Sequence, residues 1–201
     1  YVSMGSGDVL VADKAYGTLK TPHSAVYVYS YPRIVVNKFT DQVIVGNVKL
    51  TDGQYLAVGG TTATTAKPSG GYAYFKDGIL TLHNFTLKNS PYKTSAYTTY
   101  DEYIQIFAPK AYVLSLSGSN KLESDEKVTS AVRAPSDLFI QQEAAGGSLE
   151  IDSRKVGIYA YNSEVFFDSG KLDITSVDTG IECGNGTLFF NNSDLTINSQ
   201  T

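Results

Sequence analysis

Short runs of alternating apolar and polar residues recur at regular intervals in the second half of the chain. The first run reads "GIYA" at 157–160 and "GIEC" at 180–183, with counterparts at 130–134 and 104–108. Equivalent residues are spaced by 26, 26 and 23 positions. Residues two apart on a strand share a face, so two columns are predicted to point inward. The first column is Ile106, Val132, Ile158 and Ile181, and the second is Ala108, Ala134, Ala160 and Cys183.

Two further runs complete each repeat, and neither shows helical periodicity. The second run covers residues 112–116, 138–140, 165–167 and 188–190. The third run covers residues 121–124, 148–153, 171–176 and 194–199. Each third run ends in a serine, which gives the column Ser124, Ser153, Ser176 and Ser199. Alternation turns these hydroxyls inward, so we expect them to bond one another or the backbone of the turns.

A period of 20–50 residues is typical of solenoids and repeat arrays. Three alternating strands per repeat do not fit a leucine-rich repeat, and a propeller blade needs about 40 residues or more. The pattern therefore predicts a single-stranded parallel β-helix with coils of about 23–26 residues. Each coil then places three strands on three faces, and equivalent strands stack about 4.8 Å apart.

The first hundred residues do not follow this period. Residues 1–70 are expected to form a β-rich N-terminal cap with irregular early strands, and residues 71–201 to form the coils. The sequence "KDG" at 76–78 predicts a tight turn between two strands. A cap is expected because a parallel solenoid exposes unpaired strand edges at its ends. The last coil is expected to continue beyond Thr201, or to associate end to end with another copy through its open edge.

Several of these segments resemble a family of bacterial surface proteins described as carbohydrate-binding domain-containing, from Gram-positive gut and cellulolytic bacteria. The resemblance covers roughly residues 42–201, and its motifs are "GYAYFKDGILTLHNFTL", "YVLSLSGSNKLES" and "GIYAYNSEVFFDSGKLDITS". It implies a right-handed parallel β-helix shaped like the polysaccharide lyases. It also implies a secreted or cell-surface location and binding of a polysaccharide or glycan.

Composition agrees with an all-β chain and narrows the partners. Tyr numbers 15, Gly 18 and Trp 0, and only 18% of residues are charged. Residues 101–201 carry seven Lys and Arg against fifteen Asp and Glu, so nucleic acid is not an expected partner. The sequence contains no run of 18 or more apolar residues, so we expect no membrane insertion. The single Cys allows no disulfide framework.

The outward positions of the first run are the candidate ligand-binding residues. They are Phe107, Arg133, Tyr159, Tyr161 and Glu182. An exposed aromatic column could stack on sugar rings, while the charged side chains bond hydroxyls or a carboxylate. The alternative is that segments from residues 59–100 fold over this face and bury it.

The third run supplies a candidate calcium site at Glu150, Asp152 and Asp173. Carboxylates on neighbouring strands could share Ca²⁺, which prefers several oxygen ligands. Ca²⁺ is the only cofactor that the pattern suggests. The favoured alternative is a solvated acidic face with lysines interleaved.

These features favour a non-catalytic, extracellular glycan-binding or adhesive domain. One alternative is a polysaccharide lyase acting on acidic polysaccharide, with Asp173, Asp178, Lys171 and Arg154 as available groups but no spacing that selects them. Another alternative is a passive structural stalk. The two histidines lie far apart in the chain, and Cys183 is expected to be a buried filler of its column.

Overall fold

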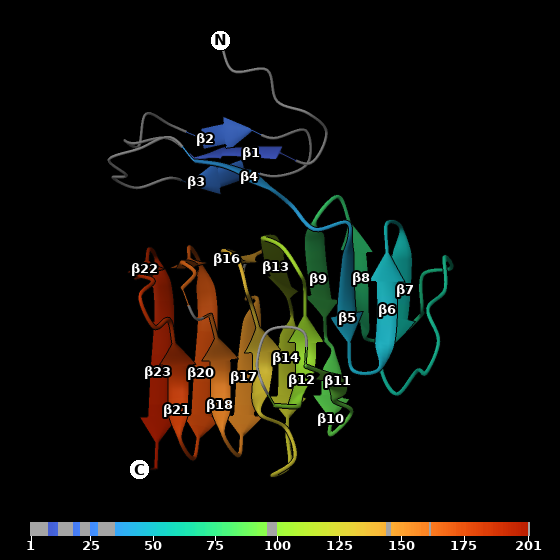
Figure 1. The fold of residues 1–201 in the computed structure, drawn as a ribbon. Helices are drawn as coiled ribbons and strands as arrows, with labels where there is room; N and C mark the ends of the chain where they lie inside the picture. The colour runs from blue at the N-terminus through green and yellow to red at the C-terminus, as the bar shows by residue number, and fades with distance from the viewer. Residues whose placement is uncertain are drawn as a thin grey trace.

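The computed structural model describes residues 8–11, 18–20, 25–27, 35–95, 100–143, 146–160 and 162–200. All helical or extended structure in these ranges is β-strand (Figure 1). The strands are β1 (Asp8–Val11), β2 (Thr18–Lys20), β3 (Ala25–Tyr27), β4 (Val35–Lys38), β5 (Gln42–Val45), β6 (Val48–Thr51), β7 (Gln54–Ala57), β8 (Tyr72–Lys76), β9 (Ile79–His83), β10 (Thr86–Lys88), β11 (Tyr92–Thr94), β12 (Glu102–Phe107), β13 (Tyr112–Ser117), β14 (Ser119–Glu123), β15 (Ser130–Arg133), β16 (Leu138–Gln142), β17 (Ser148–Ser153), β18 (Val156–Tyr159), β19 (Val165–Phe167), β20 (Gly170–Ser176), β21 (Thr179–Glu182), β22 (Leu188–Phe190) and β23 (Ser193–Ser199).

Three sheets run the length of the solenoid. The first sheet has the order β21-β18-β15-β12-β5-β6, and β11 also pairs with β12. The second sheet is β22-β19-β16-β13-β9-β8-β7, and the third is β10-β14-β17-β20-β23. Each coil gives one strand to each sheet, and the four complete coils begin at β12, β15, β18 and β21. Every strand pair between successive coils is parallel, so the predicted all-β parallel β-helix is confirmed.

The inward columns lie where the alternation predicts. Ile106 pairs with Val132, Val132 with Ile158, and Ile158 with Ile181. The first three of these side chains are fully buried, together with the alanines of the second column. Apolar residues from all three sheets close this interior into one cluster. Burial of these apolar side chains away from water is the main force that holds the coils in register.

The glycine of the "G-I-x-A" run is explained by the corner between the first and third sheets. A Cβ atom at Gly157 would lie 2.6 Å from Cγ2 of Ile174 and 2.5 Å from the carbonyl oxygen of Gly180. At Gly180 the same atom would overlap Ile197. A close-packed interior cannot absorb such contacts, so the corner requires a residue without a side chain.

The serine column is buried in three of its four coils, as predicted. Ser124 Oγ donates to Ser153 Oγ at 3.4 Å, and Ser153 Oγ donates to the carbonyl oxygen of Val156 at 2.9 Å. Ser176 is also buried, whereas Ser199 in the last coil is exposed. The expected hydrogen bonds therefore form at Ser124 and Ser153, whereas the buried Oγ of Ser176 has no hydrogen-bond partner among the described residues.

Antiparallel strands extend the first and second sheets at the N-terminal end. β5 pairs antiparallel with both β12 and β6, and β8 pairs antiparallel with β7 and β9. Asp77 and Gly78 both have positive φ, so the predicted D-G turn between β8 and β9 is confirmed. Leu50 and Leu56 lie in the same core as the coils. Parallel pairing in the second sheet begins at β9.

Candidate functional site

The structure brings four of the five predicted ligand-binding residues into one row on the outer face of the first sheet. Phe107 pairs with Arg133, Arg133 with Tyr159, and Tyr159 with Glu182, on β12, β15, β18 and β21. The fifth, Tyr161, lies outside the described residues. Side chains directly opposite on neighbouring strands lie about 5 Å apart, so the row is continuous.

The row is not open along its whole length, contrary to the expected exposed ladder. β11 pairs antiparallel with the first half of β12, and the ring of Tyr92 stacks on Phe107 at 5.9 Å and 21°. Phe107 and Arg133 are buried, while Tyr159 and Glu182 are half-buried. The Tyr92 ring lies against Phe107 and the Tyr159 ring lies against Arg133, so aromatic side chains cover this part of the row.

Arg133 is held by a buried carboxylate. Its Nε lies 3.3 Å from Oε1 of Glu102, and the two side chains are 6% and 3% exposed. Nε and Nη1 of Arg133 and Oε2 of Glu102 have no hydrogen-bond partner among the described residues, so the contact is an ion pair without a hydrogen bond. A buried charge is costly unless it is paired, so Glu102 compensates the charge of this guanidinium. The sequence pattern did not identify Glu102, which begins β12 two residues before the first repeated run at 104–108.

Tyr159 covers the guanidinium from the solvent side. The Cζ atom of Arg133 lies 4.2 Å from the centre of the Tyr159 ring, which is a close cation–π contact. Burial and the Glu182 carboxylate raise the pKa of Tyr159, although the Arg133 charge acts in the opposite direction. The phenol therefore stays protonated at neutral pH.

Cys183 and Lys171 both hold their protons more tightly than usual. Burial, with a further contribution from Glu182, raises the pKa of the Cys183 thiol, so it stays protonated and is a poor nucleophile. Lys171 Nζ lies 2.6 Å from Asp173, and this contact raises the pKa of the lysine, which therefore holds its proton instead of acting as a base.

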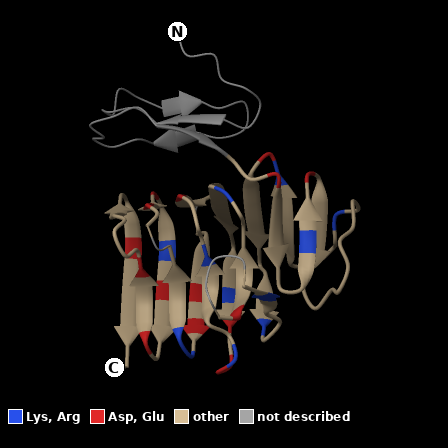
Figure 2. Cartoon of the chain, viewed as in Figure 1, with Lys and Arg blue, Asp and Glu red and all other residues tan. Residues whose placement is uncertain are grey.

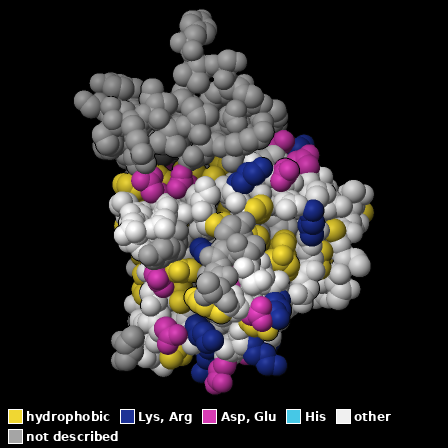
Figure 3. Space-filling view, viewed as in Figure 1, with side chains coloured by type: hydrophobic (Ala, Val, Ile, Leu, Met, Phe, Trp, Pro, Cys, Tyr) yellow, Lys and Arg dark blue, Asp and Glu magenta, His cyan; other side chains and the backbone are white. Residues whose placement is uncertain are grey.

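The third sheet pairs the carboxylates that were predicted to bind calcium. Glu150 Oε1 lies 2.7 Å from Lys121 Nζ, and Asp173 is paired with Lys171. Figure 2 marks basic and acidic positions on neighbouring strands here, and Figure 3 shows side chains of both signs on the surface of this view. Within the part of the chain that the structure describes, no group of three or more His, Cys, Asp or Glu could hold a metal ion. Glu150 and Asp173 are thus each paired with a lysine, as the alternative of a solvated acidic face expects, and the calcium site at Glu150, Asp152 and Asp173 stays a prediction.

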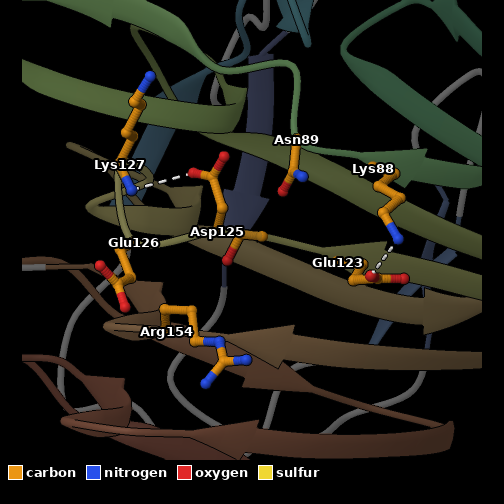
Figure 4. Close-up of a pocket in the computed structure, with 8 residues that line it drawn as sticks. Lys88, Asn89, Glu123, Asp125, Glu126, Lys127 and Arg154 are labelled. Atoms are coloured by element: carbon orange, nitrogen blue, oxygen red, sulfur yellow. Dashed lines mark hydrogen bonds and ion pairs between the residues drawn. The ribbon is translucent and has the colours of Figure 1, made fainter.

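A groove of about 540 Å³ follows the corner where the strands of the third sheet end (Figure 4). Its walls come from Lys88, Asn89, Glu123, Ser124, Asp125, Glu126, Lys127 and Arg154. Lys88 Nζ lies 2.6 Å from Glu123, and the backbone N–H of Lys127 donates to Asp125 at 2.9 Å. Three cations face three carboxylates here, so the groove selects no strongly charged ligand.

Comparison of the chain with protein-family models, with curated proteins and with solved structures finds no match. The resemblance to bacterial surface proteins therefore stays a prediction. Among the described residues, no helix is long and apolar enough to cross a membrane.

Proposed function

We propose that this chain is a non-catalytic glycan-binding domain that acts outside the cell, as part of a secreted or surface-attached protein. The observation that supports this proposal is the row on the first sheet. A half-buried tyrosine, Tyr159, lies on a guanidinium that Glu102 holds in place, and Glu182 is its neighbour on the next coil. An aromatic ring beside fixed polar groups is the usual composition of a sugar-binding surface.

The charge of this row favours neutral glycans over acidic ones. The charge of Arg133 is already matched by Glu102, whose carboxylate is 3.3 Å away. Glu182 then adds a negative charge beside Tyr159. An acidic sugar would face this carboxylate without a free cation to balance it, which lowers its affinity.

The proposed contacts are stacking and hydrogen bonding at one edge of the solenoid. The C–H face of a sugar ring packs against Tyr159, and Glu182 accepts hydrogen bonds from its hydroxyls. Arg133 is a positioning residue, because burial keeps it from direct contact.

Binding of the purified protein to an array of neutral and acidic polysaccharides tests this proposal. We expect retention on neutral glycans and about tenfold weaker binding for Tyr159→Ala, from the loss of one stacking contact. Tyr159→Phe is the matched control, because it keeps the ring on Arg133 and removes only the hydroxyl. Its binding should fall less than that of Tyr159→Ala.

Other outcomes would replace the proposal. Release of unsaturated sugars from pectin would establish a lyase. No binding to any glycan would favour a structural stalk. Binding that is equal in the wild type and Tyr159→Ala would remove the first sheet as the binding site.

A further inference from the structure

Four aromatic rings form a second cluster on the outer face of the second sheet, in the strands that precede the regular coils. Tyr55 on β7 stacks on Tyr74 of β8 at 4.1 Å and 21°. Tyr72 on β8 stacks on His83 of β9 at 4.9 Å and 27°, and Tyr55 meets Tyr72 edge-on at 5.4 Å. All four side chains are half-buried. Their neighbours along the strands, including Phe75, point into the core.

Hydrogen bonds hold the histidine of this cluster in one orientation. Oδ1 of Asn84 accepts the backbone N–H of Ser119 at 3.1 Å, which turns Nδ2 of the same amide toward Nε2 of His83 at 3.3 Å. Nε2 must then accept, so Nδ1 carries the hydrogen and donates to Oγ of Ser117 at 3.0 Å. These contacts hold the His83 ring in its stack on Tyr72.

One side of the cluster borders a row of small hydroxyl side chains. Thr81 lies opposite Tyr74 on β9, and Ser115 lies opposite Thr81 on β13. Tyr74 has a single aromatic neighbour among the described residues, so no ring packs on the face that it turns toward Thr81. Gln141 continues the same row on β16. Ser115 is itself buried, so Thr81 and Gln141 are the half-buried polar groups beside the aromatic rings.

We propose that this surface, which we call the tyrosine wall (Tyr55, Tyr72, Tyr74 and His83), is a second glycan-binding site. Its ligand is a neutral sugar chain whose hydroxyls are equatorial. Such a sugar has apolar C–H faces that stack on Tyr74 and a polar rim that bonds Thr81 and Gln141. The wall is rigid before binding, so little side-chain entropy is lost when the ligand docks. The inference extends the proposed function to another face and shares no residue with the first-sheet row.

Calorimetric titration with cellohexaose, a β-linked glucose oligomer, tests the tyrosine wall. The α-linked oligomer maltohexaose serves as the ligand control. The titration is made in the Tyr159→Ala background, so that the first-sheet row cannot contribute. We expect cellohexaose to bind, and Tyr74→Ala to weaken binding about tenfold. Near-ultraviolet circular dichroism reports the ring stacks directly, because the chain has 15 Tyr and no Trp.

A second variant guards against a folding defect in Tyr74→Ala. Thr81→Lys fills the surface beside Tyr74 without removing a ring, and Thr81→Val is its control of matched shape. Binding that is lost in Thr81→Lys and largely kept in Thr81→Val supports the inference. Absence of cellohexaose binding, or equal binding in Thr81→Lys and its parent, overturns it. Neither result depends on whether Tyr159 binds a glycan, so the two proposals fail separately.

Discussion

The outer faces of the first and third sheets are built from the same coils in the same register, yet they carry charge in different ways. On the third sheet, the Lys121–Glu150 ion pair keeps both side chains in contact with solvent, at 38% and 56% exposure. On the first sheet, Arg133 and Glu102 are nearly removed from solvent beneath Tyr159. The faces differ because aromatic rings lie against the first-sheet row, Tyr92 on Phe107 and Tyr159 on Arg133. The ion pairs of the third sheet keep their contact with solvent.

In a solenoid of this kind, specificity for a ligand can reside where a charged side chain is buried and its geometry is fixed. Exposed ion pairs contribute little to stability and are screened by salt, so the outer face of the third sheet behaves as an ordinary solvated surface. A buried pair is costly to assemble and very costly to break. The first sheet therefore has one rung whose geometry is fixed, and that rung lies where the ligand is proposed to bind.

The largest expected effect comes from removing the buried carboxylate. Glu102→Ala leaves the Arg133 charge buried without its partner, and we expect the free energy of unfolding to fall by about 3–5 kcal/mol. Urea unfolding followed by far-ultraviolet circular dichroism measures this change. Glu150→Ala on the third sheet is the control and should have a much smaller effect. Equal losses for the two variants would contradict the distinction between the faces.

A double variant separates the effect of the buried charges from the effect of packing. Glu102→Leu with Arg133→Met replaces both charges by apolar groups of similar size. We expect its free energy of unfolding to lie within about 1–2 kcal/mol of the wild type, because no charge is left buried and unpaired. A loss as large as that of Glu102→Ala would mean that packing, and not charge, is responsible.

Removing the ring above the guanidinium should have an intermediate effect. We expect Tyr159→Ala to lower the free energy of unfolding by about 1 kcal/mol, since it ends the cation–π contact with Arg133. Tyr159→Phe should lie close to the wild type in the same urea experiment. A full loss in Tyr159→Phe would assign the effect to the hydroxyl group.

The smallest expected effect is on how the melting temperature depends on pH, and it comes from Glu123 at the edge of the third sheet. The hydrogen bond from Lys88, with a further contribution from its charge, lowers the pKa of Glu123. The ionised form is thus favoured by folding, so its contribution is present above the ordinary pKa of the carboxyl and is lost as pH falls through the lowered value. Melting temperatures measured from pH 7 to pH 3 should show a slightly shallower decline in Glu123→Gln. High salt should remove the difference.

The repeat made most of the coil architecture predictable. Ile158, Ala160 and Ser153 each belong to a column that recurs at the coil period, and the structure buries all three. Alternation of period two leaves little choice about which side chains point inward. The sequence could not explain Gly157, because its role depends on the distance to Ile174 on another sheet.

The candidate sites were less predictable, because they depend on segments outside the repeat. The covering of Phe107 comes from Tyr92 on β11, which no column predicts. The tyrosine wall was missed for a similar reason, since Tyr55 and Tyr74 meet through antiparallel pairing of β7 with β8. The alternation "YAYF" at 72–75 was the available signal, with two tyrosines on the face opposite Phe75.

The parallel stacking of the coils also sets how the molecule responds to force. Hydrogen bonds between successive coils run along the solenoid axis, so a pull along this axis loads them one coil at a time instead of shearing a whole sheet. Each coil of 23–26 residues would then release about 75–90 Å of chain as it peels away. A protein of this architecture lengthens in steps under tension, and its rate of extension is limited by the coil that opens next.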